Sequence, residues 1–387
     1  MTAPATSGDR LEWANTLRGL AALLVVIAHL GAAFFVGFFG PALGYPVNDT
    51  LPDWPPGQWL LSLPFDLGGF GVSLFFLLSG LVITKSLHKY SRSGFAAARA
   101  LRILPTFAAV YLFIVVAVAL ANNANGMPYA VDAREAAVGM VPGLPTVTRT
   151  PSLGLGVEWT LIIELLFYAA CLIPFRRLQT ERRWVPLMAV TSAVVLVVLF
   201  SWTSLAGSLL SGPRLLLMMF CLYLPILLIG VTAAGGLGRR NVIQIVGLAG
   251  LYLVGSFFAD PPIPMEARFS VLLAVPVFIA ACVFGGRWNG HAATSFLADI
   301  SYPLYLLHIL LGSIVMYALA SQNLPALVVL AGGLSAVAAT AWVFHVAIEV
   351  PTHRWGQRLA RSRFPAHTEN QGDHENPSDA TVTGSDP

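Results

Sequence analysis

Residues 17–39 read LRGLAALLVVIAHLGAAFFVGFF, an almost uninterrupted apolar run in which Arg18 and His29 are the ionisable side chains. About 20 such residues form a helix that crosses the ~30 Å hydrocarbon core of a bilayer. The run is too long for the apolar part of a cleavable signal peptide, and it carries a charge and an imidazole. We therefore interpret it as a transmembrane helix that the mature protein retains.

Nine further stretches have the same length and character. They are 67–86, 103–121, 156–174, 185–202, 213–233, 241–258, 268–284, 300–319 and 325–347. A closed β-barrel would instead give short segments of alternating hydrophobicity, which the sequence does not contain. The sequence predicts an all-α, polytopic membrane protein with about ten transmembrane helices.

The composition excludes several other classes. The chain has 387 residues, of which 56% are hydrophobic and 11% are charged, whereas a soluble domain carries about 25% charged residues. The basic residues lie between the apolar stretches rather than in one patch, so the partner is the lipid bilayer and not a nucleic acid. The three cysteines lie inside apolar runs without CxxC spacing, which argues against disulfides and against a metal site.

The charge distribution predicts the orientation. With the N-terminus inside, seventeen Lys and Arg residues fall in inner segments and four in outer loops, and inner segments of membrane proteins are the basic ones. Both termini are therefore predicted to be cytoplasmic, in a multi-pass protein of the cell (inner or plasma) membrane. The expected parts are a cytoplasmic segment 1–16, a membrane domain 17–355, and a polar, disordered tail 356–387.

Two polar residues of the first span lie on one helical face. Arg18 and His29 are eleven residues apart, which is close to three full turns and about 16 Å along the axis. Arg18 is placed at the cytoplasmic mouth and His29 near the middle of the membrane. Ionisable groups at such depth are functional candidates, although a lone buried histidine is more often a hydrogen-bonding link between helices.

Glu164 of the fourth span is predicted to lie at the depth of His29, about 12 Å from the outer end of its helix. A carboxylate beside an imidazole orients the ring and raises its basicity, as a general base acting on a hydroxyl requires. We therefore expect Glu164 to meet His29. A purely structural buried ion pair is the alternative.

Further polar residues lie near the cytoplasmic ends of the spans. Arg99 and Arg102, at positions i and i+3, share a helical face and suit a phosphate; lipid headgroups or a role in topology alone are alternatives. Tyr302, Tyr305 and His308 form one stripe. We interpret this stripe as mostly structural, together with the group that closes the last span, which comprises His345, Glu349 and Arg354.

Six motifs in order along about residues 15–355 resemble the acyltransferase 3 family of integral membrane acyltransferases. They are LRGLAALLVVIAHL at 17–30, GVSLFFLLSG at 71–80, RALRILP at 99–105, WTLIIELLFY at 159–168, ISYPLYLLH at 300–308, and a closing Glu349, Pro351 and Arg354. The chain departs from the family at Asn15, where an aspartate is usual, and at Thr160, where a serine is usual. Many bacterial members carry an esterase-like domain fused after the spans, and we expect this protein to be a stand-alone form without it.

The resemblance implies an enzyme that moves an acyl group, commonly acetyl, from cytoplasmic acyl-CoA to a hydroxyl of a glycan, glycolipid or polyketide-type acceptor, with no bound cofactor. The candidate residues are His29 and Glu164 for catalysis, and Arg18, Arg99, Arg102, Trp159, Tyr302 and Tyr305 for substrate binding. His29 would deprotonate the acceptor or briefly carry the acyl group itself.

Two other functions fit some of these observations. Ten spans with buried charges also occur in secondary transporters, but the chain shows no repeated half and no paired broken helices. An acyltransferase acting on an intracellular small molecule, such as a macrolide or its sugar, keeps the same chemistry with a different acceptor.

Overall fold

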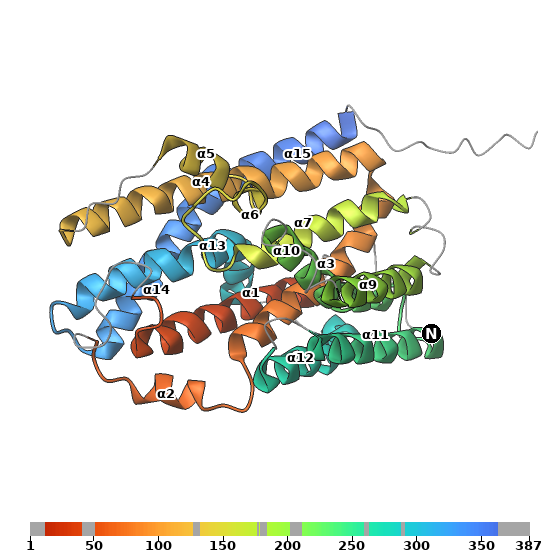
Figure 1. Ribbon diagram of the computed structural model, residues 1–387, viewed down its shortest axis with the longest axis horizontal. Helices are drawn as coiled ribbons and strands as arrows, with labels where there is room; N and C mark the ends of the chain where they lie inside the picture. The colour runs from red at the N-terminus through yellow and green to blue at the C-terminus, as the bar shows by residue number, and fades with distance from the viewer. Residues whose placement is uncertain are drawn as a thin grey trace, which may run out of the picture.

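The structure, a computed structural model, describes residues 12–40, 51–126, 132–175, 178, 184–201, 211–258, 263–287 and 291–362. Every regular element within these ranges is a helix, and no strand occurs among them. The long helices run roughly alongside one another as a bundle (Figure 1). The predicted all-α class is confirmed.

Within the described residues, eight segments are long and apolar enough to cross a membrane. They are built from α1 (Glu12–Val26) with η1 (Ile27–Ala32) and η2 (Ala33–Val36), α3 (Leu67–Lys89), α4 (Arg92–Ala124), α10 (Ser211–Ala233), α11 (Arg239–Phe257), α12 (Met265–Phe284) with η6 (Gly285–Arg287), α13 (Ala292–Ala320), and α14 (Ala326–Phe344) with η7 (His345–Glu349) and α15 (Val350–Ser362). Shorter helices α2 (Pro55–Leu61), α5 (Ala133–Gly139) and α6 (Leu144–Thr148) lie in the two longest loops.

The two remaining predicted spans, 156–174 and 185–202, form shorter apolar helices. The first is α7 (Glu158–Leu172), whose 15 residues give a length of about 22 Å, less than the ~30 Å of a hydrocarbon core. The second is α9 (Trp184–Ser201), of which Trp184–Leu199 is the described apolar part. The polytopic character of the prediction is confirmed with eight full-length helices.

Several predicted boundaries differ from the structure; for example, the span expected from residue 300 belongs to α13, which begins at Ala292. The third span is expected from residue 103, but α4 begins at Arg92, where Ser91 caps the helix by accepting a hydrogen bond from the Gly94 amide. The tail expected from residue 356 is wrong at its start, because α15 continues to Ser362. The N-terminal segment expected to end at 16 already contains the first turn of α1. Residues 1–11 and 363–387 lie outside the described residues.

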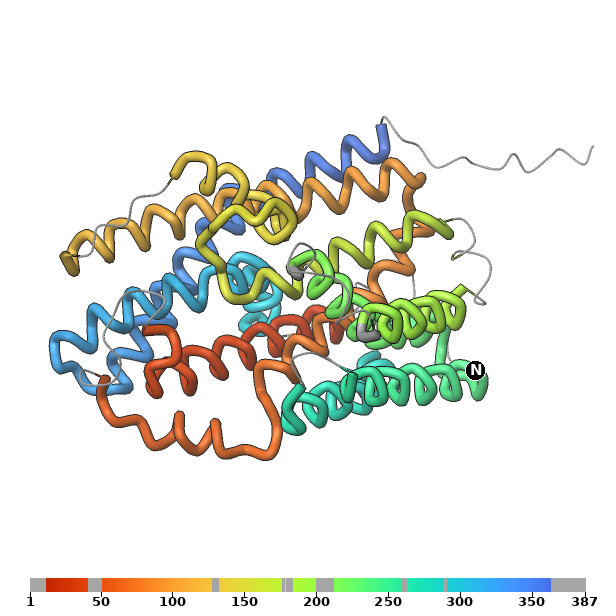
Figure 2. Tube along the Cα trace, viewed as in Figure 1, coloured from red at the N-terminus to blue at the C-terminus, as the bar shows by residue number. Residues whose placement is uncertain are grey.

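The first helix is packed at the centre of the bundle. α1, red in Figure 2, lies against α3 and against α13, the cyan to blue helix from the other end of the sequence. Glycines allow the close approach: a Cβ on Gly19 would lie 2.9 Å from the Thr294 carbonyl oxygen, and one on Gly71 would lie 2.7 Å from that of Ala21. Small residues at helix crossings are the usual means of packing within lipid.

The tightest crossing joins α3 and α10. A Cβ on Gly80 would lie 1.9 Å from the carbonyl oxygen of Leu227, and one on Gly230 would lie 2.1 Å from that of Leu77. These distances are too short for any side chain. The Ser79-Gly80 pair therefore places α10 directly against α3, and this fixes the α3 face that carries Ser79.

We expect Gly80→Ala to lower the apparent melting temperature of the detergent-solubilised protein, with a cost of about 1–3 kcal/mol from overpacking against backbone. Gly247→Ala on α11 is the control, because a Cβ added there would meet no atom within 4 Å and alanine favours a helix over glycine by up to ~1 kcal/mol. Equal melting temperatures for the two variants would contradict the close crossing.

Candidate functional site

A cavity of about 140 Å³ lies between α1, α3, α4, α7 and α13. Its lining residues are Ala14, Asn15, Arg18, Val72, Phe75, Phe76, Leu78, Ser79, Val82, Arg99, Arg102, Ile103, Thr160, Leu161, Glu164, Tyr168, Ser301, Tyr302, Tyr305 and Leu306. Three arginines and one glutamate therefore share a space whose other walls are mostly apolar and aromatic. Six of the eight residues that the sequence singled out line this cavity, and the exceptions are His29 and Trp159.

Arg99 is the most firmly held of the three arginines. Its side chain is only 8% exposed and donates a hydrogen bond to the hydroxyl of Ser86. The guanidinium also lies over the ring of Tyr168, 5.0 Å from the centroid, and over that of Phe95 at 5.7 Å. Cation–π contacts of this kind fix a guanidinium without neutralising it, so Arg99 supplies a positive charge at a fixed place in the wall.

Arg18 and Arg102 keep unused hydrogen-bond donors. Arg18 donates from Nη2 to Asn15 Oδ1 at 3.2 Å, while its buried Nε has no partner among the described residues. Arg102 makes no hydrogen bond within the part of the chain that the structure describes. A guanidinium has five N–H donors and is always charged. The cavity therefore presents donors that only a further acceptor satisfies.

Asn15 shows how this chain manages one departure from the family pattern. The amide oxygen of Asn15 accepts from Arg18 one helical turn away, as an aspartate oxygen would. The neutral amide holds the guanidinium in place without cancelling its charge, which keeps the cavity more positive.

Glu164 is the carboxylate of the cavity. Its Oε1 accepts a hydrogen bond from the hydroxyl of Ser79 at 2.7 Å and another from the hydroxyl of Tyr168, one turn along the same helix. Ser79 comes from α3, which the α10 crossing holds in register. Both hydrogen bonds go to one oxygen, so Oε2 retains its acceptor capacity.

The expected contact between Glu164 and His29 is wrong. His29 Nδ1 instead lies 2.9 Å from Nε2 of His308, whereas Glu164 bonds Ser79 and Tyr168. Residue counting predicts depth along the helix axis, but the face of α7 that carries Glu164 is turned toward the arginine cavity. A shared depth does not imply a contact when several other helices surround the same helix.

The His29–His308 pair lies at the π-helical end of the first span. η1 (Ile27–Ala32) is a π-helical segment with i→i+5 hydrogen bonds. Such segments are rare in proteins, and those that occur are often found at functional sites. The loop that follows the span closes over it, because Trp54 donates from its indole nitrogen to the Gly31 carbonyl oxygen at 3.0 Å. His308 is fully buried, and His29 is half-buried.

Sequence reasoning missed the carboxylate that acts on His29. It is Asp66, an exposed residue that caps α3 by accepting from the Gly68 amide at 2.9 Å. Asp-x-Gly before an apolar run is a helix N-cap signal. Because α3 runs antiparallel to the first span, a carboxylate at the start of α3 lies near the C-terminal end of the first span.

Two tyrosines of α13 connect the cavity to its surroundings. Tyr302 donates to the carbonyl oxygen of Ile103 at 2.9 Å, which ties α13 to α4. The hydroxyl of Tyr305 lies 2.9 Å from Oγ1 of Thr160, so the threonine keeps the hydroxyl that a serine would supply. The Tyr305 ring lines the cavity and is 5.7 Å from the His308 ring. Tyr305 therefore lies between the cavity and the histidine pair.

Trp159, the remaining candidate, lies outside the cavity. Its ring packs 5.6 Å from that of Tyr223 and 6.4 Å from that of Phe76. Phe76 does line the cavity. Trp159 thus supports the wall from behind and does not face the space.

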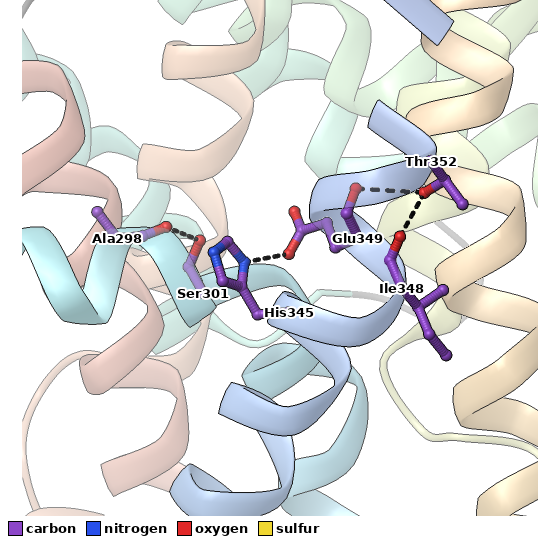
Figure 3. A network of polar contacts seen from close by, with 6 residues as sticks. All are labelled: Ala298, Ser301, His345, Ile348, Glu349 and Thr352. Carbon is purple, nitrogen blue, oxygen red and sulfur yellow. Dashed lines mark hydrogen bonds and ion pairs between the residues drawn. The ribbon is translucent and has the colours of Figure 1, made fainter. Parts of the chain in front are cut away.

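A second polar network lies beside the cavity. His345 Nδ1 and Glu349 Oε2 are 2.9 Å apart within the π-helix η7. Figure 3 shows the His345 ring between Glu349 and Ser301 of α13, and Ser301 is itself a lining residue. Glu349 also acts electrostatically on Arg18 and Tyr302. The sequence analysis interprets Glu349 as mostly structural, although its place in the closing motif is a signal that could have marked it as a site residue.

We expect Glu349→Gln to lower the apparent melting temperature, because it removes a carboxylate that offsets the arginine charge inside the bundle. The cost is about 1–3 kcal/mol, below the roughly 3–5 kcal/mol of a fully buried pair, since both side chains are partly exposed. Glu266→Gln, at an exposed glutamate of α12, is the matched control. A Glu349→Gln variant as stable as that control would show that the carboxylate does not balance the cluster.

Comparison with known proteins identifies the family. The acyltransferase 3 family model, described as an acyltransferase domain, matches residues 11–345. That range includes the entire cavity, both histidines of the pair and His345. Comparisons with curated proteins and with solved structures gave no match. Since the match covers most of the chain, the protein belongs to the acyltransferase 3 family and is a membrane acyltransferase.

Proposed function

We propose that the protein is an O-acyltransferase that moves a short acyl group, acetyl in the simplest case, from cytoplasmic acyl-CoA to a hydroxyl of a glycan, glycolipid or polyketide-type (macrolide) acceptor. The observation that carries the proposal is the cavity in which Arg18 and Arg102 have unused donors beside Glu164. A space with spare guanidinium donors at one end and apolar walls at the other matches a thioester donor, which is anionic at one end and apolar at the other.

The positive end of the cavity accounts for donor binding. Phosphate oxygens are bound most strongly by guanidinium groups, which offer paired N–H donors. By the positive-inside rule, the arginine end faces the cytoplasm, where acyl-CoA is made. Exposed Lys85 and Lys89, near the end of α3 that also carries cavity residues, add to the positive field around the mouth. The arginines would hold phosphates there while the acyl end extends inward.

The apolar end of the cavity, away from the arginines, suits a short acyl group. Val72, Phe75 and Leu306 line it, and Tyr305 closes it through its bond to Thr160. The total volume of about 140 Å³ is below the roughly 300–1,000 Å³ of sites that enclose a whole drug-sized ligand. The cavity therefore suits the terminal part of the donor, with the nucleotide remaining outside.

The reaction needs a base for the acceptor hydroxyl, and His29 is that base in this proposal. His29 takes the hydroxyl proton as the oxygen attacks the thioester carbonyl. A new C–O bond forms, the C–S bond breaks, and His29 returns the proton to the leaving thiolate. Tyr305 lines the cavity and contacts His308, the partner of His29. The thioester therefore reaches the base by extending past the Tyr305 ring. Glu164 positions the cavity wall and does not contact the base.

We expect Arg102→Gln to raise the KM for acetyl-CoA by roughly 10- to 100-fold, the equivalent of one lost charged hydrogen bond of about 1.5–3 kcal/mol. Arg102→Lys keeps the charge but not the paired donors, so its KM is expected to lie between those of the wild type and Arg102→Gln. Arg239→Gln, at an exposed arginine that begins α11, is the matched control. An unchanged KM in Arg102→Gln would exclude Arg102 from donor binding.

The central test gives labelled acetyl-CoA to inside-out membrane vesicles that contain the wild type, His29→Ala or, as the control, His291→Ala at an exposed histidine. Endogenous glycolipids and added macrolides are then searched for label. We expect label with the wild type and the control, and loss of at least about 100-fold in His29→Ala, because general-base catalysis contributes roughly 10²–10⁴-fold. Uptake of label without a covalent product would favour a transporter, and equal label from all three would remove His29 from the chemistry.

A further inference from the structure

The histidine pair forms a directed chain of hydrogen bonds. His308 Nδ1 lies 2.8 Å from the backbone carbonyl oxygen of Tyr305, and His308 Nε2 lies 2.9 Å from Nδ1 of His29. The Tyr305 carbonyl can only accept a hydrogen bond. His308 Nδ1 therefore carries a proton and is the donor in that bond.

The burial of His308 determines which of the other ring nitrogens carry a proton. Its side chain is 0% exposed, and a cationic imidazolium in that position, with another histidine as its neighbour, would be costly. His308 is therefore neutral, and its Nε2 has a lone pair and accepts. The donor to it must be the N–H at His29 Nδ1.

The two histidines differ in what they can reach. His29 is half-buried, with the exposed carboxylate of Asp66 acting on it, while His308 is enclosed between Tyr305 and His29. With its Nδ1 proton engaged, a neutral His29 has its lone pair on Nε2. His29 is thus the partner that a substrate can approach.

We propose that His308 is a positioning residue that fixes the tautomer and orientation of His29, so that Nε2 of His29 accepts the proton of the acceptor hydroxyl. The inference rests on the proposed acyl transfer and refines the role of its base. Which ring nitrogen of a histidine is protonated is set by the hydrogen bond that the other nitrogen makes. Hydrolases commonly use a carboxylate for this purpose, whereas this chain uses a second imidazole.

A single proton moves during the step, and His29 both accepts it and releases it. The hydroxyl proton passes to His29 Nε2 as the new C–O bond forms, and it passes from Nε2 to the thiolate sulfur once the C–S bond has broken. The Nδ1 proton of His29 stays in its bond to His308 throughout. His308 gains and loses no proton, so its contribution is geometric.

Two amide variants of His308 separate positioning from mere packing. The side-chain oxygen of His308→Gln lies about as far from the backbone as the imidazole Nε2 and can accept from His29. The shorter amide of His308→Asn can bond the Tyr305 carbonyl but does not reach His29. Ser313→Ala, at a fully buried α13 residue whose hydroxyl has no partner among the described residues, controls for a change in the core of the same helix.

The measurement is kcat and KM for acetyl-CoA in vesicles, with apparent melting temperatures for every variant. We expect His308→Asn to lower kcat by about 10- to 100-fold, the range for removal of a histidine's hydrogen-bonding support, with KM unchanged. His308→Gln and Ser313→Ala are expected within about 3-fold of the wild type. If a folded His308→Asn keeps the wild-type kcat, or a folded His308→Gln is as slow as His308→Asn, the positioning role is overturned while acyl transfer stands. An inactive wild type overturns both proposals.

Discussion

Charged side chains cannot face the hydrocarbon core of a bilayer, and this constraint determines how the bundle is arranged. Arg18, Arg99 and Arg102 come from two helices, and all three line one enclosed cavity. The Arg18 charge is offset from within the protein by Glu349, Asp299 and Glu164. Burying charge in this way costs stability unless each group is paired or hydrogen-bonded. The spare donors of Arg18 and Arg102 therefore mark a place where the fold gives up stability, as the proposed binding of an anionic donor requires.

The polar groups are divided between two neighbouring places, and α13 joins them. Tyr305 lines the arginine cavity through its ring, bonds Thr160 through its hydroxyl, and receives the His308 bond at its carbonyl. One residue thus contacts both the proposed donor site and His308, the partner of the proposed base His29. Division of this kind suits a reaction whose donor and acceptor approach from opposite ends of the protein, with their reactive groups meeting beside a single ring.

Helix irregularities coincide with the polar groups. The two π-helical segments of the described residues are η1, which carries His29, and η7, which carries His345 and Glu349. A π-turn inserts one extra residue per turn and so changes which face of the helix each following side chain takes. No sequence pattern indicated either segment. Tertiary contacts such as the Trp54 bond to Gly31 are available to stabilise η1.

The sequence by itself determined the fold class, the family, and six of the residues that line the cavity, since apolar length and ordered motifs are local properties. Arg99 and Arg102 were predicted to share a face from their i, i+3 spacing, and both line the cavity. Tertiary structure alone decided the partners. Depth along the helix axis predicts that Glu164 lies beside His29. In the structure, the rotation of α7 and α13 about their axes instead places Glu164 against Ser79 and His308 against His29. That rotation depends on helix packing between distant segments, which residue counting along one helix does not contain.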